Sequence, residues 1–165
     1  MSDITLRHAT PDDVDLYYEW ANDPEVRRQS FSGEPIPYEA HVHWFSQKMA
    51  DPSSHLFVML DGTDPVGQIR FDVVNGIAGI GYSVARHARG RGLARRLVEL
   101  GVAAMSRLGV TVFEASVKPT NAPSLAVFRR CGFEERGDAN CRVFVLDIGS
   151  PGQDAAPDGE RSRQT

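Results

Sequence analysis

The chain has 165 residues, a length that suits one domain with a single hydrophobic core. Its hydrophobic content of 41% and charged content of 24% are ordinary for a soluble globular protein. No apolar run approaches the roughly 20 residues that span a bilayer, and Met1-Ser2-Asp3 does not begin a signal-peptide pattern. The net charge of -4 disfavours nucleic acid as the main partner, because phosphate binding usually needs a basic surface. We therefore expect a cytoplasmic protein that binds neither nucleic acid nor membranes.

The two cysteines, Cys131 and Cys141, lack the spacing of metal ligands. A disulfide between them is possible in principle, but two free thiols are the expectation for a cytosolic protein. No metal site is predicted.

The first half of the chain reads as a strand, three helices and three strands. Thr10 can cap the first helix, and Pro11 suits its first turn. Asn75-Gly76, between the last two strands, is a hairpin signal. The predicted strands cover residues 4–7, 55–60, 65–74 and 77–84, and the predicted helices cover residues 10–21, 25–29 and 38–50.

The second half alternates helices and strands, which predicts an α/β protein with a mixed sheet. The elements are a helix over 92–108, a strand over 110–117, a helix over 121–130 and a strand over 142–148. The residues predicted to face the core are Leu93, Leu97, Leu100, Ala104 and Leu108 in the first helix, and Leu125 and Phe128 in the second. Residues 150–165 have little apolar content, so we expect one domain over residues 1–149 and a disordered tail over 150–165.

A glycine-rich loop lies between the strand 77–84 and the long helix. Its sequence is Arg89-Gly90-Arg91-Gly92-Leu93-Ala94, and Arg86, Arg95 and Arg96 flank it. Because the two glycines lack side chains, backbone N–H groups can close on phosphate oxygens, and the helix start adds unpaired donors. The loop is neither a Walker loop nor a dinucleotide fingerprint. A solvated helix start is the simpler alternative, but the elements on either side and the charge favour an anion site.

The form Arg-x-x-Gly-x-Ala at 89–94 resembles the pyrophosphate motif of the GNAT acetyltransferases. Residues 121–133 are similar to the second signature of that family, a helix that runs from an asparagine to a Gly-Phe pair. The resemblance covers roughly residues 4 to 148. It implies the GNAT fold, an α/β (α+β) domain whose mixed, mostly antiparallel sheet of six to seven strands is flanked by helices.

The resemblance also implies acetyl-CoA as the cosubstrate. The loop amides would hold the pyrophosphate, the end of the strand at Val84 would splay to pair with pantetheine, and Asn121 would contact the CoA arm. From the residues alone, Asn121 can also be only a helix cap and Val84 only a core residue. The implied CoA-binding residues are Ser83, Val84, Ala85, Arg89, Gly90, Arg91, Gly92, Leu93, Ala94, Asn121 and Phe128.

Two catalytic groups that are familiar in this family are absent. Phe128 stands where many members have a tyrosine that protonates the leaving thiolate, and Ser116 stands at a frequent general-base position. The CoA thiol resembles that of cysteine, with a pKa of about 8.5, and leaves readily. Positioning, together with a backbone N–H near Val84 that stabilises the oxyanion, can then carry the reaction. The catalytic candidates are His41, Ser83 and the backbone of Val84.

The N-terminal segment is expected to bind the acceptor. Trp20, Asn22, Pro24 and His41 resemble the branch of the family that acetylates a UDP-linked 4-amino sugar in pseudaminic acid synthesis. Ala21 stands where that branch usually has an arginine.

The candidate acceptor residues combine aromatic rings, cations and an imidazole. Trp20 and Trp44 can stack on a ring or base, Arg27 and Arg70 can hold UDP phosphates, and His41 can orient or deprotonate the amine. Alternatively, the tryptophans are core residues and Arg70 forms a surface pair with Asp72. The full candidate set is Trp20, Asn22, Arg27, His41, Trp44 and Arg70.

Three functions are consistent with these features. The first is N-acetylation of a small-molecule amine, a nucleotide-linked amino sugar above all. The second is ribosomal-protein-type acetylation of protein N-termini. The third is a non-catalytic CoA-binding regulatory module, which Phe128 and Ser116 suggest. A homodimer is a possible assembly in each case.

Overall fold

A mixed sheet runs through the protein, of which the computed structural model describes residues 3–149. Its strands are β1 (Ile4–His8), β2 (Ser54–Asp61), β3 (Asp64–Val74), β4 (Ile77–Val84), β5 (Val112–Val117), β6 (Glu134–Gly137) and β7 (Arg142–Asp147). The spatial order is β1-β2-β3-β4-β5-β7-β6, and every neighbouring pair is antiparallel except β4 with β5. The predicted mixed, mostly antiparallel sheet is therefore confirmed. Within residues 3–149, the short edge strand β6 is the one strand that was not predicted.

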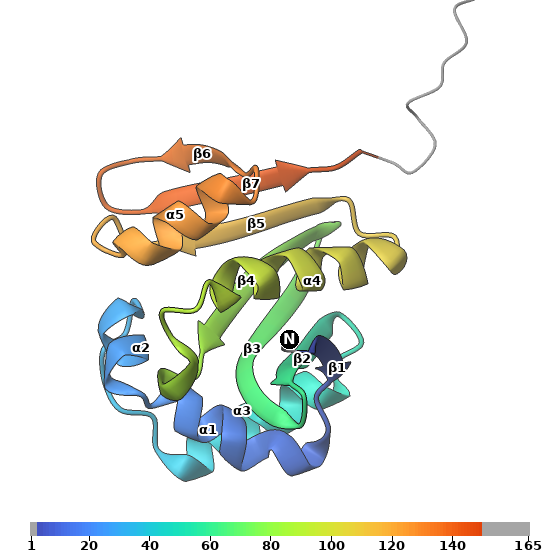
Figure 1. Ribbon diagram of the computed structural model, residues 1–165, viewed down its shortest axis with the longest axis vertical. Helices are drawn as coiled ribbons and strands as arrows, with labels where there is room; N and C mark the ends of the chain where they lie inside the picture. The colour runs from blue at the N-terminus through green and yellow to red at the C-terminus, as the bar shows by residue number, and fades with distance from the viewer. Residues whose placement is uncertain (1–2, 150–165) are drawn as a thin grey trace, which may run out of the picture.

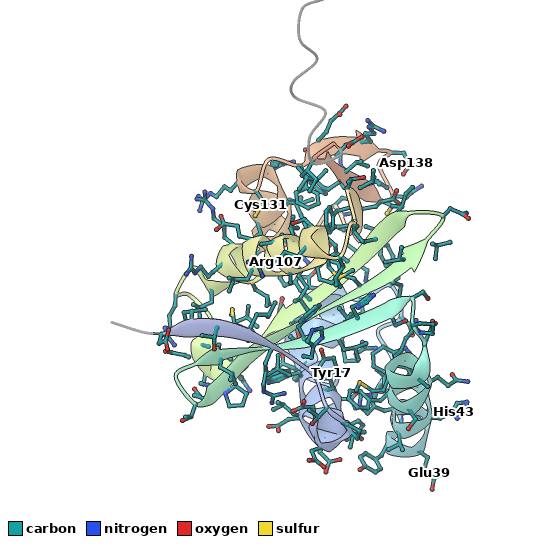
Figure 2. All side chains as sticks on the ribbon, turned by 90° about the vertical axis from the view of Figure 1, so that its right-hand side faces the viewer. Tyr17, Glu39, His43, Arg107, Cys131 and Asp138 are labelled. Atoms are coloured by element: carbon teal, nitrogen blue, oxygen red, sulfur yellow. The ribbon has the colours of Figure 1, made fainter. Side chains whose placement is uncertain are left out.

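Helices cover both faces of the sheet. They are α1 (Val14–Ala21), α2 (Pro24–Gln29), α3 (Tyr38–Ala50), α4 (Leu93–Arg107) and α5 (Ala122–Arg130), with short 3-10 turns at Pro11–Asp13 and Arg86–Ala88. In Figure 1, α4 and α5 lie in front of the sheet, and α3 lies behind it. Glu39 and His43, labelled in Figure 2, are on the outer side of α3.

Local sequence signals explain how the central strands are placed. Asn75 and Gly76 adopt φ of +52° and +78° and close the β3–β4 hairpin, as their sequence predicts. Side chains then alternate along β3 between the two faces. Ile69 and Phe71 face α4, so Gln68 and Arg70 face the opposite side, where α1 and α3 lie.

The buried face of α4 differs from the prediction. The buried residues are Leu93, Leu97, Val98, Gly101 and Met105. Leu108, predicted to be in the core, is 58% exposed, because it lies past the end of the helix as its C-cap. Gly101 sets the closest approach to the sheet, since a Cβ there would lie 2.8 Å from Ile69 Cδ1 and Phe71 Cζ.

The inward face of α5 agrees with the prediction, because Leu125 and Phe128 are both buried. Phe128 packs against the rings of Tyr82, Phe133 and Phe144. The tail expected over residues 150–165 lies outside the described residues.

Candidate active site

β4 and β5 are paired only near the start of each strand. Their parallel register joins three pairs of residues: Ile77 with Val112, Ala78 with Phe113, and Gly79 with Glu114. Beyond these pairs the strands diverge toward their C-terminal ends, as Figure 1 shows. The divergence opens into a cavity of about 1060 Å³, which the helices α1 to α3 line on one side and the starts of α4 and α5 on the other. β4 ends at Val84, where the resemblance implied a splayed strand end.

The backbone of Val84 points into this opening. Ala85 N donates to Val66 O on β3 at 2.8 Å. Because successive N–H groups of a strand point to opposite sides, the N–H of Val84 is directed away from β3, toward the gap before β5. The carbonyl of Val84 is on the same side and accepts a hydrogen bond from Arg89 Nε at 3.2 Å. The site therefore presents a fixed backbone donor at the end of β4.

The loop before α4 forms a second group of backbone donors. Gly90 and Gly92 have φ of +79° and +73°, the left-handed region that favours glycine, and a Cβ at either would meet nothing within 4 Å. α4 begins at Leu93, so its first amides have no helical partner. Open space over such amides fits a phosphate or pyrophosphate group.

The cavity lining includes most of the implied CoA-binding residues. Ala85 and Arg91 are the two that do not line it; the others are Ser83, Val84, Arg89, Gly90, Gly92, Leu93, Ala94, Asn121 and Phe128.

Several arginines around the loop are already paired with acids. Arg89 contacts Asp23 Oδ1 at 2.8 Å, and Asp23 also caps α2. Arg91 contacts Asp61 at 2.7 Å, and Arg95 contacts Glu99 at 2.8 Å. These ion pairs position the side chains and offset part of the positive field that the sequence suggests. The loop backbone is therefore the stronger part of the anion site.

The α5 side of the cavity contains a hydroxyl pair that sequence reasoning missed. Tyr82 Oη donates to Ser124 Oγ at 2.9 Å, and burial raises the pKa of the Tyr82 phenol. Asn121 caps α5 by accepting from Ser124 N at 3.3 Å. In the sequence, Tyr82 could have been identified as a site residue from its position two residues before the end of β4. Ser116 lines the cavity and is exposed.

The acceptor candidates separate into two groups. Arg27, His41, Trp44 and Arg70 line the cavity. Trp20 does not line it; it is 8% exposed and packs against Tyr17.

Asn22 is also outside the cavity lining and joins two segments of backbone. Its amide donates to Ile36 O at 2.9 Å and accepts from Ile36 N at 2.8 Å, which fixes the α2–α3 connection to the end of α1. Its position and contacts are those of a structural residue.

Two of the cavity residues are engaged in structural hydrogen bonds. Arg27 donates to Ala21 O at 2.7 Å, Ser32 O at 3.1 Å and Ser30 Oγ at 3.1 Å, so its guanidinium holds the loop after α2. His41 Nε2 lies 2.8 Å from Val14 O. Since a carbonyl only accepts, this nitrogen carries the proton, and only Nδ1 could accept one from an amine.

Arg70 differs from these residues because its charged group faces the cavity. The guanidinium lies over the Trp44 ring, 5.6 Å from the ring centroid. With its amide oxygen turned toward Arg70, Gln68 accepts from Nη1 at 3.1 Å. Burial lowers the pKa of the Arg70 guanidinium, although it stays charged at any physiological pH.

The structure also describes the cysteines, possible metal ligands and the length of the helices. Both Cys131 and Cys141 are free thiols. Within residues 3–149, no cluster of three or more His, Cys, Asp or Glu side chains is arranged to hold a metal ion. In the same part of the chain, no helix has the length and apolar character needed to cross a membrane.

The fold, the divergent strands and the glycine loop define a CoA-dependent acyltransferase. Residues 3–134 match the family model described as an acetyltransferase (GNAT) domain, and the chain belongs to this family. It is an acetyl-CoA-dependent N-acetyltransferase, so the non-catalytic module considered from the sequence is not retained.

Relatives and solved structures extend the comparison. The chain is 27% identical to the uncharacterized N-acetyltransferase p20 of Bacillus licheniformis, over 81% of this chain and 80% of the relative. It is 29% identical to the L-amino acid N-acetyltransferase AaaT of Escherichia coli, over 83% of this chain and 86% of the relative. The structure of spermidine N-acetyltransferase from Vibrio cholerae in complex with CoA and spermine superposes with a TM-score of 0.78 at 18% identity, covering 88% of this chain and 95% of that one. The last likeness concerns the fold alone.

Proposed function

We propose that this enzyme transfers an acetyl group from acetyl-CoA to the amine of a UDP-linked 4-amino-deoxy sugar. The observation that carries the proposal is the acceptor side of the cavity, where an aromatic ring, Trp44, lies beside a cation, Arg70. An aromatic plane suits a base or sugar ring, and a guanidinium suits a phosphate. A cytoplasmic location, expected from the sequence, is part of the proposal.

The chain contributes positioning and fixed dipoles to this reaction. When bound, acetyl-CoA supplies the acetyl group as a thioester. The amides after Gly90 and at the start of α4 would hold its pyrophosphate, and the N–H of Val84 would donate to the carbonyl oxygen. The amine would arrive from the α1–α3 side of the sheet as the free base and attack the thioester carbonyl. The C–S bond would break, CoA would leave as the thiolate, and the proton released by the nitrogen would pass to His41 Nδ1 or to a water molecule.

A second acceptor is a free amino acid. The relative AaaT, named an L-amino acid N-acetyltransferase, is 29% identical and matches most of both chains. Arg70 would then meet a carboxylate in place of a phosphate. The N-terminus of a protein is the other acceptor predicted from the sequence, and the experiment below includes it as a third class of amine.

The test is acetyl-CoA turnover with a panel of amines. The panel contains a UDP-linked 4-amino sugar, L-amino acids, a peptide with a free N-terminus and spermine, and the release of CoA thiol is measured. We expect the highest kcat/KM with the sugar nucleotide. A higher kcat/KM with any other member of the panel would refute this acceptor.

A further inference from the structure

Arg70 is a partly buried cation that forms no ion pair within residues 3–149. The nearest acid along its strand, Asp72, is held elsewhere: Lys48 Nζ and Ser54 Oγ contact Asp72 Oδ1 at 2.8 Å and 2.6 Å. The surface pair of Arg70 with Asp72 that the sequence allowed is therefore absent. Burying a charge without a partner is costly, so a partner from outside the chain is the simplest explanation for its position.

The chain makes room for this guanidinium. Gly81 is the cross-strand neighbour of Arg70, and a Cβ at Gly81 would lie 2.6 Å from Arg70 Cζ and 2.8 Å from Nη2. Gly81 has no positive φ, so its backbone does not require glycine. The absence of a side chain at Gly81 leaves the space that the Arg70 guanidinium occupies. The Arg70 guanidinium is held in place at the cavity wall by two contacts. It lies over the Trp44 ring, and its Nη1 donates to Gln68 Oε1.

The charges of the cavity wall point to an anion. Its lining includes four Lys and Arg cations, Arg27, Arg70, Arg89 and Lys118, and one carboxylate, Glu25. Two of these charges have partners outside the lining, since Arg89 pairs with Asp23 and Glu25 pairs with Arg28, each at 2.8 Å; the other three cations remain in excess. Such a lining disfavours a polyamine acceptor, which needs carboxylates, and favours an acceptor with negative charge.

We propose that Arg70 binds an anionic group of the acceptor, which must carry a phosphate or carboxylate as well as the amine. The guanidinium lies at Gly81, and Gly81 precedes Val84 by three residues, about 10 Å along a strand. The amine and the anionic group of the acceptor are therefore expected to lie several ångströms apart. A sugar nucleotide or an ω-amino acid carries the two groups at separate positions, so either fits this arrangement better than an α-amino acid, which has both groups on one carbon.

This inference rests on the proposed acetyl transfer, but it is tested separately by pairs of amines that differ only in the anion. The phosphate pair is a UDP-linked 4-amino sugar and the same sugar as its methyl glycoside. The carboxylate pair is 5-aminovalerate and 5-aminovaleramide. Arg70→Gln should lower kcat/KM for the preferred anionic amine on the order of 10- to 100-fold, mainly through KM. It should change kcat/KM for the matched neutral amine by less than about threefold, since that amine makes no ionic contact.

Steric displacement of the guanidinium provides a variant that keeps the charge. Gly81→Ala places a methyl group where Arg70 lies, so the flexible side chain must move, and it should reproduce the KM effect of Arg70→Gln. Gly79→Ala, two residues earlier on β4, is the matched control, since its Cβ would meet only Asp72 O at 3.6 Å. Arg107→Gln controls for lost charge; Arg107, labelled in Figure 2, is exposed at the C-terminal end of α4.

A binding measurement makes the test independent of turnover. The intrinsic tryptophan fluorescence of the CoA-bound enzyme is titrated with UDP and with glutarate, because Trp44 touches the proposed anion site. We expect a response to at least one probe in the wild type, and a response at least tenfold weaker in Arg70→Gln. No response in the wild type, equal responses in both proteins, or equal kinetic losses for charged and neutral amines would overturn the proposal. Turnover of 5-aminovalerate but not the sugar nucleotide, with the Arg70 effect intact, would refute only the proposed sugar acceptor.

Discussion

Gly90 and Gly92 are the residues on which the proposed binding of the CoA pyrophosphate depends most directly. Both have positive φ in the turn that leads into α4, and a Cβ at either position would meet no atom within 4 Å. Any other residue at these positions would strain the backbone by about 1–2 kcal/mol and would add atoms beside the amides. The glycines are therefore required by conformation and by access together.

Gly92→Val is expected to abolish most CoA affinity. The new side chain strains a residue with φ of +73° and fills the space that a phosphate would enter. Gly109→Val is the control, because Gly109 has φ of +91° and is exposed at the far end of α4. Calorimetric titration with CoA should show a large loss for Gly92→Val and little change for Gly109→Val, with similar losses in melting temperature. Equal CoA affinity in folded Gly92→Val and the wild type would refute the pyrophosphate assignment.

Phe128 is a packing residue that carries no proton-donating group. It is 2% exposed, and the rings of Tyr82, Phe133 and Phe144 surround it. Its position has the packing role that the sequence predicted. The nearby hydroxyls of Tyr82 and Ser124 lie on the cavity wall.

Phe128→Tyr is expected to change turnover by less than about tenfold, equivalent to about 1.4 kcal/mol of barrier. A CoA thiolate leaves readily, so amine attack should limit the rate and an added proton donor should matter little. Phe128→Leu serves as the packing control and should cost roughly 1–3 kcal/mol of stability. Steady-state kinetics and thermal melts measure both. A gain of tenfold or more in kcat for Phe128→Tyr would contradict this account.

At the scale of elements, the pairing of β4 with β5 determines where the site forms. Hydrogen bonding between them stops after Gly79 and Glu114, and the unpaired ends create the opening. The N-terminal helices α1 to α3 then line one side of the cavity, and Asn22 and Arg27 fix the α2–α3 connection through backbone carbonyls. The site is therefore a gap in the sheet bounded by elements distant in sequence.

The sequence predicts the regular elements well, because long helices and alternating strands have clear periodicity. It misses β6, a four-residue strand with a mostly exposed surface, which has no such pattern. It also places Leu108 in the core, because periodicity does not show where a helix ends. The side of the cavity lined by α1 to α3 is the least predictable part of the site. Arg27 and Arg70 both line the cavity and read alike in sequence, and only the structure shows that Arg27 donates to backbone carbonyls whereas Arg70 lies over Trp44.

Asp13 stabilises the start of the N-terminal helices, and its contribution should depend on pH. It is 6% exposed, accepts two hydrogen bonds from Arg7 at 2.8 Å and 2.9 Å, and accepts from Thr10 N at 2.7 Å. The Arg7 hydrogen bonds are the main reason that the pKa of this carboxyl is held below its ordinary 3.8. The stabilisation is thus fully present above the unfolded pKa and is lost as pH falls through the lower folded pKa.

Asp13→Asn should lower the free energy of unfolding at pH 7 by about 1.5–3 kcal/mol, since charge-assisted hydrogen bonds are lost. The difference from the wild type should shrink below about pH 4, where the carboxyl of the unfolded wild type becomes protonated, and should shrink further as pH falls through the lower folded pKa. Asp12→Asn is the control, because Asp12 is a neighbouring acid that is exposed. Denaturant unfolding at pH 7 and pH 3 measures the effect. A difference that does not change between these pH values would argue against the ionic origin.

At the scale of the whole molecule, charge is distributed unevenly. The chain has a net charge of -4, yet the Lys and Arg side chains on the cavity wall outnumber its carboxylates. An acidic surface with a cationic cavity directs anions to one place and limits unspecific binding of nucleic acid. This charge distribution suits an enzyme with an anionic cosubstrate. On our proposal, the acceptor is anionic as well.

The last strand marks the point beyond which the chain should be dispensable. β7 pairs with β5 as far as Asp147 opposite Val112, and Ile148 N donates to Thr111 O at 2.9 Å. Truncation after Gly149 keeps both contacts and removes only residues 150–165, whose composition offers no core residues. Melting temperature and turnover should therefore stay unchanged. Truncation after Leu146 is the matched control: it removes both contacts and should cost about 1–3 kcal/mol, or roughly 3–8 °C. A marked loss of stability or activity in the longer truncation would show that the tail contributes to the folded enzyme.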